Sequence, residues 1–174
     1  MLFKDVLQLP SYISSALNVG NMNKPKTNMG SFNGTGFHSF PIRVYYEDTD
    51  AAGIVYYANY LRFAERARTE LLRDIGVAHE FIKENWQVEF VVRNCNADYL
   101  RPAFLDESLE VLTSCKEIMG ASITLRQVVA RDGEELVVMD VKIACRHCEG
   151  ATAVRIPTDV RAAFQQFKYK EFEV

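Results

Sequence analysis

The chain has 174 residues, and its 20 lysines and arginines against 23 aspartates and glutamates give a formal net charge of −3. This length favours a single domain, and the slight acidity argues against nucleic acid as a partner, since such proteins usually present a basic surface. No apolar run approaches the roughly 20 residues that span a bilayer, so we expect no integral membrane segment. No signal peptide of the usual form is recognisable, and we expect a cytoplasmic protein.

The N-terminal part differs in composition from the rest. Residues 20–36 are rich in Asn, Gly, Ser, Thr and Lys, and such a segment cannot bury enough apolar surface to offset its ordering entropy. We therefore predict a flexible leader over residues 1–38, a folded domain over 39–168 and a tail over 169–174. Met29 leaves open that the native protein starts internally. On this division His38 belongs to the leader and is expected to have no role.

The predicted domain opens with a strand and a helix. Alternation over Phe40–Tyr46 predicts a strand with one apolar face, made of Phe40, Ile42, Val44 and Tyr46. Helical spacing predicts a helix over Tyr60–Ile75, ended by Gly76 in the left-handed conformation. The small residues Ala64 and Ala67 on its apolar side indicate that a sheet packs closely there.

After a polar connection over residues 78–85, the chain reads as a run of long strands. The predicted strands are Val88–Tyr99, Glu107–Ile118, Ser122–Ala130, Glu135–Cys145 and a short Ala151–Ile156. Pro157 then marks the start of a short C-terminal helix. One long helix with one antiparallel sheet predicts an α+β fold, in which the sheet wraps the helix. Exposed edge strands favour pairing with a second copy.

Three acidic side chains, Glu47, Asp48 and Asp50, crowd into four positions just before the predicted helix. The unpaired amides and the positive dipole end of a helix N-terminus offset such a concentration of negative charge. A carboxylate beside free amides is also one arrangement for acyl chemistry, with a base or nucleophile next to donors for an oxyanion. Helix capping by Asp48 and Asp50 is the structural alternative.

Several motifs together resemble a known family. They are Tyr45-Tyr46-Glu47-Asp48-Thr49-Asp50, Gly53-Ile54-Val55-Tyr56-Tyr57, Asn59-Tyr60, Glu65-Arg66-Ala67-Arg68 and Tyr99-Leu100-Arg101-Pro102-Ala103. Over about residues 40–167 the chain is similar to the YbgC-type acyl-CoA thioesterases of the hotdog fold, in the branch that includes hydroxybenzoyl-CoA thioesterase. The resemblance implies a hotdog fold, with an antiparallel sheet wrapped around one long central helix.

The resemblance also implies an activity and a site. The reaction is hydrolysis of acyl-CoA thioesters to a free acid and coenzyme A, without a cofactor or metal. Asp50 matches the catalytic carboxylate, acting as general base or nucleophile, and the backbone N–H of Tyr57 would polarise the thioester carbonyl. Many close members carry His where this chain has Tyr57, so an oxyanion role here rests on the amide alone. We predict substrate-binding roles for Tyr46, Asn59 and Arg93, with capping or loop support as the alternative for Asn59.

The implied assembly is a homodimer or homotetramer with active sites at subunit interfaces. Related proteins resemble partners of cell-envelope or phospholipid-synthesis machinery, so a non-catalytic or weakly catalytic binding or scaffold role is the alternative function. A hotdog dehydratase or hydratase would need a His at the site, and residues 45–59 contain none. Cys145-Arg146-His147-Cys148 is a single CxxC, whereas structural zinc sites use four ligands, so we expect no metal there.

Overall fold

The computed structural model describes residues 30–32 and 36–167, and its framework is one six-stranded antiparallel sheet with helices on one face. The strands are β1 (Ser31–Phe32), β2 (His38–Arg43), β3 (Val88–Tyr99), β4 (Ser108–Ile118), β5 (Ser122–Arg131) and β6 (Glu134–His147). The helices are α1 (Tyr57–Asp74), α2 (His79–Trp86), α3 (Thr158–Gln165) and the short 3₁₀ turn η2 (Tyr46–Asp48).

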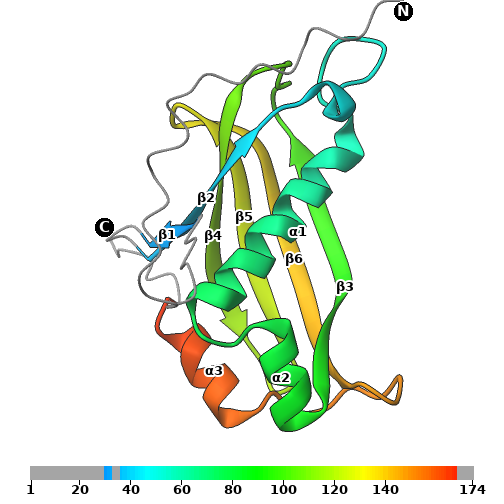
Figure 1. Ribbon diagram of the computed structural model, residues 1–174, viewed down its shortest axis with the longest axis vertical. Helices are drawn as coiled ribbons and strands as arrows, with labels where there is room; N and C mark the ends of the chain where they lie inside the picture. The colour runs from blue at the N-terminus through cyan, green and yellow to red at the C-terminus, as the bar shows by residue number, and fades with distance from the viewer. Residues whose placement is uncertain (1–29, 33–35, 168–174) are drawn as a thin grey trace, which may run out of the picture.

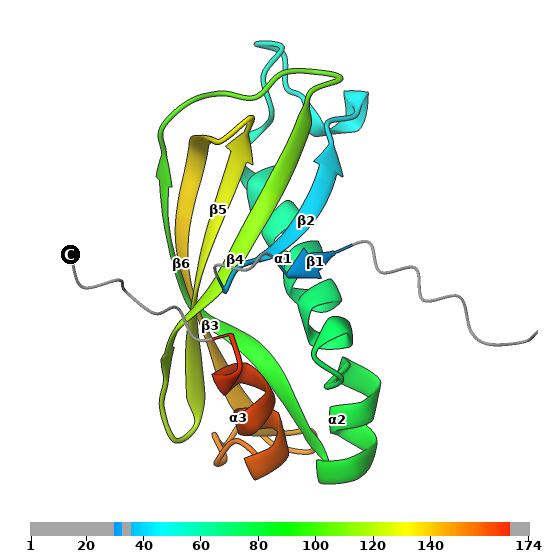
Figure 2. The same cartoon turned by 90° about the vertical axis from the view of Figure 1, so that its left-hand side faces the viewer.

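The strands lie in the order β1-β2-β4-β5-β6-β3, and α1 crosses the sheet diagonally (Figure 1). Viewed from the side, the sheet curves around α1 (Figure 2). This arrangement confirms the predicted α+β hotdog fold with one long helix and a short C-terminal helix. None of the helices in the described ranges is long and apolar enough to cross a membrane.

The core lies between α1 and the concave face of the sheet. Phe63, Ala64, Ala67 and Leu71 on the helix have no exposed surface, so the predicted apolar side of the helix is correct. The Gln127 side chain of β5 donates to the Ala64 carbonyl at 3.0 Å. A contact between a sheet side chain and a helix backbone requires small helix residues, which confirms the close packing predicted from the two alanines.

Around that contact, a small polar network is buried between α1 and the sheet. Gln127 Oε1 accepts from Arg68 Nη1 at 2.6 Å, and Gln127 Nε2 also donates to the Thr113 hydroxyl at 3.1 Å. The Arg68 guanidinium pairs in addition with Glu65, one helical turn earlier. Arg68 is only 9% exposed, and Gln127 and Thr113 are fully buried. Buried polar groups are costly unless paired, and here each has a partner.

Four predicted boundaries are wrong. The first strand ends at Arg43, and Tyr46 lies in η2, because the Asp48 carboxylate accepts the Tyr45 N–H and turns the chain. Helix α1 begins at Tyr57, one turn before its apolar repeat becomes visible in the sequence. Residues 78–85, predicted to be a polar connection, form most of α2. Residues 151–156 form no strand and contribute one isolated bridge, between Ala153 and Arg146.

The sheet also extends into the predicted leader. Residues 31–32 form β1, and His38 begins β2, so the sheet starts before the predicted boundary at residue 39. His38 is fully buried, and its Nε2 lies 2.9 Å from Asp74 Oδ2 at the end of α1, so His38 belongs to the folded domain and contributes to its packing. A Cβ on Gly30 would lie 2.3 Å from the same ring nitrogen. The predicted tail, 169–174, and most of the leader lie outside the described residues.

Candidate active site

Asp48 shapes the segment that leads from β2 to α1. Its side-chain Oδ2 accepts the Tyr45 N–H at 2.9 Å, and its carbonyl accepts the Tyr56 N–H and the Asn59 side-chain amide, each at 2.9 Å. Asp48 is 4% exposed and Asn59 is 6% exposed. The Asp48 side chain therefore stabilises the turn of η2, and it does not cap α1, whose N-cap residue Tyr56 has no side-chain cap. The side-chain amide of Asn59 holds the loop, which was the alternative to a substrate contact.

Asp50 lies at the start of the tight turn that follows. Its N–H donates to the Ile54 carbonyl, and its own carbonyl accepts the Gly53 N–H, both at 2.9 Å. The φ of Gly53 is 76°, in the left-handed region that glycine adopts without strain. Asp50 Oδ1 accepts the Ala52 N–H at 2.8 Å. No hydrogen bond between described residues uses Oδ2, so one carboxylate oxygen is left for other partners.

Tyr57 is the first residue of α1, where backbone amides have no partner within the helix. Among the described residues, no hydrogen bond uses the Tyr57 N–H. The Tyr57 carbonyl accepts a hydrogen bond from the Tyr99 hydroxyl at 3.3 Å, which ties the start of α1 to the end of β3. The positive end of the helix dipole adds to the attraction of this amide for a negative oxygen.

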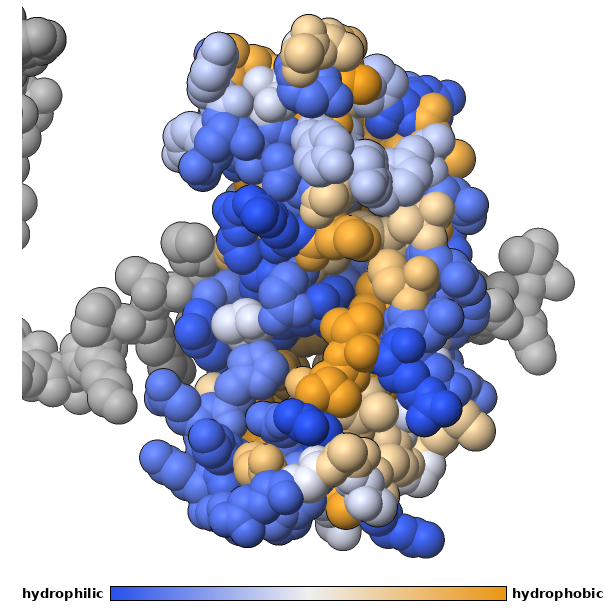
Figure 3. Space-filling view, turned by 90° about the vertical axis from the view of Figure 1, so that its right-hand side faces the viewer, coloured by the Kyte–Doolittle hydropathy of each residue, from blue (hydrophilic) through white to orange (hydrophobic). Residues whose placement is uncertain are grey.

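Asp50 and Tyr57 line the same cleft, which has a volume of about 450 Å³. Its other walls come from the start of α1 and from the segment after β3: Ile54, Val55, Tyr56, Tyr60, Tyr99, Leu100, Arg101 and Pro102. The view onto the molecule's β3 side shows a hydrophobic band between hydrophilic surfaces (Figure 3). The cleft is thus lined by an aspartate, by the first residue of a helix and by aromatic side chains.

Three tyrosines of the cleft, Tyr56, Tyr60 and Tyr99, have a raised pKa and stay protonated at neutral pH. The adjacent Tyr57 side chain, with a smaller contribution from the Asp50 charge, raises the pKa of Tyr56 above its ordinary value. Burial raises the pKa of Tyr60 and of Tyr99. These three phenols therefore act as neutral hydrogen-bonding groups, and Asp50 is the one carboxylic side chain among the residues lining the cleft.

Two predicted substrate-binding residues do not reach this cleft within one chain. Tyr46 is 83% exposed in η2, and Arg93 is exposed at the bulge of β3 between Val92 and Asn94. Their roles remain predictions. Arg101 does line the cleft, and its Nε lies 2.8 Å from Glu134 Oε1. Arg101 is part of the Tyr99–Ala103 motif, which was the available sequence signal for this wall.

Another hollow lies farther along α1 and does not include Asp50. It encloses about 40 Å³ and is mainly apolar, with lining residues that include Leu71, Leu72, Phe90 and Phe164. Elsewhere, burial raises the pKa of the Cys145 thiol to about 11, so this thiol is inert at neutral pH. In the described ranges, no cluster of three or more His, Cys, Asp or Glu side chains is arranged to hold a metal ion.

Comparison with known proteins identifies the family of this chain. Residues 44–164 match the model of the thioesterase-like superfamily. The chain belongs to that superfamily. The YbgC acyl-CoA thioesterase of Haemophilus influenzae is 45% identical over 130 residues, which cover 75% of this chain and 96% of that protein. The YbgC acyl-CoA thioester hydrolase of an Escherichia coli O6:H1 strain is 38% identical over 133 residues, covering 76% and 98%.

A solved structure agrees with this assignment. The crystal structure of a probable thioesterase from Bartonella henselae has a TM-score of 0.66 and 36% identity, and the match covers 70% of this chain and 99% of that one. Together these relatives place the chain among the YbgC-type members of the thioesterase-like superfamily, which confirms the family predicted from the motifs.

Proposed function

We propose that the protein hydrolyses acyl-CoA thioesters to a free acid and coenzyme A in the cleft that contains Asp50. The observation that carries this proposal is that Asp50 and Tyr57, the first residue of α1, line one cleft in a chain of the thioesterase-like superfamily. The 38–45% identity to YbgC acyl-CoA thioesterases supports the choice of substrate class.

In this proposal the thioester carbonyl oxygen lies against the Tyr57 N–H, where the helix dipole stabilises the charge that develops on it. Removing one such donor from an oxyanion site typically raises the barrier by about 3 kcal/mol. The free Oδ2 of Asp50 either takes a proton from the attacking water or attacks the carbonyl carbon itself. The carbon–sulfur bond then breaks, and the leaving thiolate of coenzyme A takes up a proton, from Asp50 in the first route and from water in the second. In the second route the acyl group is left on Asp50 as an anhydride, and a water molecule then hydrolyses it to the free acid and regenerates the carboxylate.

The first prediction concerns Asp50. Asp50→Asn removes the charge and basicity of the side chain while keeping its shape, so we expect kcat/KM to fall by about 10²- to 10⁴-fold, the usual contribution of a general acid–base group. The measurement is release of free thiol from a panel of short, long and aromatic acyl-CoAs. Asp132→Asn is the matched control, because Asp132 lies in the exposed β5–β6 turn.

Wild-type rates for Asp50→Asn, with the fold intact by circular dichroism, would refute the assignment of Asp50. A wild-type protein that binds acyl-CoA but turns over none of the panel would favour the alternative binding or scaffold role. The best substrate in the panel would identify the acyl preference.

A further inference from the structure

One wall of the cleft is joined directly to the turn that carries Asp50. The Val55 N–H donates to the Ala103 carbonyl at 2.9 Å, and Ile54 forms an isolated antiparallel bridge with Phe104. The Ile54 carbonyl also accepts the Asp50 N–H at 2.9 Å. A shift of the segment around Ala103 would therefore also move Asp50.

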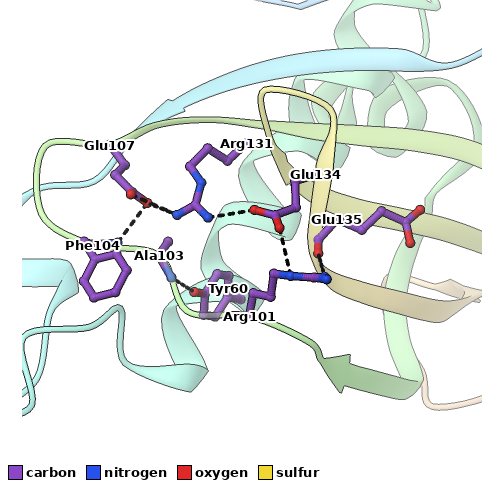
Figure 4. Close-up of polar contacts among 8 residues, drawn as sticks. All are labelled: Tyr60, Arg101, Ala103, Phe104, Glu107, Arg131, Glu134 and Glu135. Atoms are coloured by element: carbon purple, nitrogen blue, oxygen red, sulfur yellow. Dashed lines mark hydrogen bonds and ion pairs between the residues drawn. The ribbon is translucent and has the colours of Figure 1, made fainter.

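The same segment is fixed to α1 by one side chain. The Tyr60 hydroxyl accepts the Ala103 N–H at 3.0 Å, as Figure 4 shows. Tyr60 is 3% exposed and Ala103 is fully buried, so water does not readily replace this bond. Ala103 is thus held on both sides, because its N–H bonds to Tyr60 in α1 and its carbonyl bonds to Val55 beside the Asp50 turn.

A second anchor holds the following residues. Glu107 accepts the Phe104 N–H at 3.0 Å, and both of its carboxylate oxygens lie 2.9 Å from Arg131 Nη1. Arg131 in turn donates to Glu134 at 2.8 Å, and Glu134 pairs with Arg101 in the cleft wall (Figure 4). The cleft wall is therefore attached to α1 at Ala103 and to the β5–β6 hairpin at Glu107.

We propose that Tyr60 is a positioning residue, whose hydroxyl holds the Ala103 segment and through it the Asp50 turn in the geometry that hydrolysis needs. Only the expected change in kcat depends on the proposed function; the hydrogen-bonding role of Tyr60 does not. Burial, which raises the pKa of Tyr60, keeps this hydroxyl neutral and able to accept the Ala103 N–H over the working pH range.

The test is Tyr60→Phe in the full chain, which keeps the ring and its edge contacts to Phe63 and Tyr99 but removes the acceptor. We expect kcat to fall about 10- to 100-fold while KM changes less than about threefold, as when a reacting group is displaced without loss of substrate contacts. Amide hydrogen exchange, measured without substrate, should become faster at Val55 and Asp50.

Thr113→Val is the matched control. It also removes a fully buried hydroxyl that accepts a hydrogen bond, but it lies on β4 beside Gln127 and does not line the cleft. We expect a similar loss of thermal stability with kcat and Val55 exchange unchanged. Glu107→Gln, which keeps an oxygen for the Phe104 N–H but loses the ion pair, should lower kcat in the same direction by a smaller factor.

Unchanged exchange at Val55 and Asp50 in Tyr60→Phe would overturn the proposal, whatever the rate. So would a fall in kcat that Thr113→Val reproduces, because the effect would then be one of general stability. If Tyr60→Phe does not fold, exchange and kcat in Glu107→Gln decide in the same way. Failure of the proposed function appears separately, as wild-type activity in Asp50→Asn.

Discussion

Gly53 is the residue that allows the Asp50 turn to close. Its φ of 76° lies in the region that costs a residue with a side chain about 1–2 kcal/mol. An added Cβ would meet no atom within 4 Å, so the expected cost of a substitution is conformational and not steric.

Gly53→Ala should therefore lower the free energy of unfolding by about 1–2 kcal/mol, and should also slow hydrolysis because the turn that carries Asp50 relaxes. Chemical denaturation and initial rates measure the two effects. Gly120→Ala is the control, since Gly120 also has open space around it but does not have a positive φ. Equal stability of the two variants would contradict this role of Gly53.

At the scale of elements, α1 is joined to the sheet by polar as well as apolar contacts. Gln127 bridges the Ala64 carbonyl and the Thr113 hydroxyl, and it accepts from the buried Arg68. A buried group that loses its only suitable partner costs about 1–3 kcal/mol, whereas replacing both partners by apolar groups can be nearly neutral.

Gln127→Leu should therefore destabilise the fold by about 1–3 kcal/mol, and Arg68→Met in the same background should recover part of that loss. A double-mutant cycle of unfolding free energies measures the coupling, because it isolates the pairwise term. Strictly additive effects would show that the two side chains do not depend on each other. Glu65, which loses its partner in Arg68→Met, is half exposed and should add little.

Most of the elements that were predicted correctly have burial that follows a simple period, but β3, predicted with its exact bounds, does not, since most of its residues are exposed or partly exposed. The strands β4 to β6 alternate between core and outer face, and the buried side of α1 repeats every three to four residues. Helix α2 was missed because it buries fully only Ile82, while Trp86 is partly buried against the core and Phe81, whose ring meets that of Trp86, is 45% exposed. Its stability comes from tertiary packing, which local pattern does not reveal.

The site was predictable only where its residues form a local pattern in the sequence. Three acidic residues before a helix indicated a cap and a candidate catalytic group, and the structure places Asp48 in the η2 turn, without a cap on α1, and Asp50 in the cleft. Contacts between distant residues could not be read from the sequence. His38 and Asp74 are 36 positions apart, and the Ala103 segment meets Tyr60 from 43 positions away.

For the whole molecule, the exposed edge of β3 is the feature with the largest consequence. Within the described residues, this twelve-residue strand pairs only with β6, and Val92 near its middle is 52% exposed. A long open strand edge can pair with another chain, and although Glu89, Arg93 and Asp98 place charges on β3, its middle carries the exposed Val92. We therefore propose that a second copy pairs along β3, as part of the predicted homodimer or homotetramer.

Val92→Lys places a charge on this edge and should weaken self-association by about 10-fold or more, because charged residues on an edge strand oppose pairing. Sedimentation equilibrium of wild type and variant measures the change. Met119→Lys is the control, since Met119 is similarly exposed, at 48%, but lies in the turn between β4 and β5. A wild-type chain that sediments as a monomer at all concentrations would contradict the proposal.

The contact between β1 and the end of α3 has a topological consequence. The rings of Phe32 and Phe167 lie 5.8 Å apart, so the first and last described parts of the chain are neighbours. In a chain shortened to residues 30–167, a short linker between these two ends would close the backbone into a loop, and the loop can be reopened at the turn near Gly150, away from Asp50. A circular permutant cut there keeps every strand pair and every wall of the cleft, which makes this chain suited to insertion into a host protein.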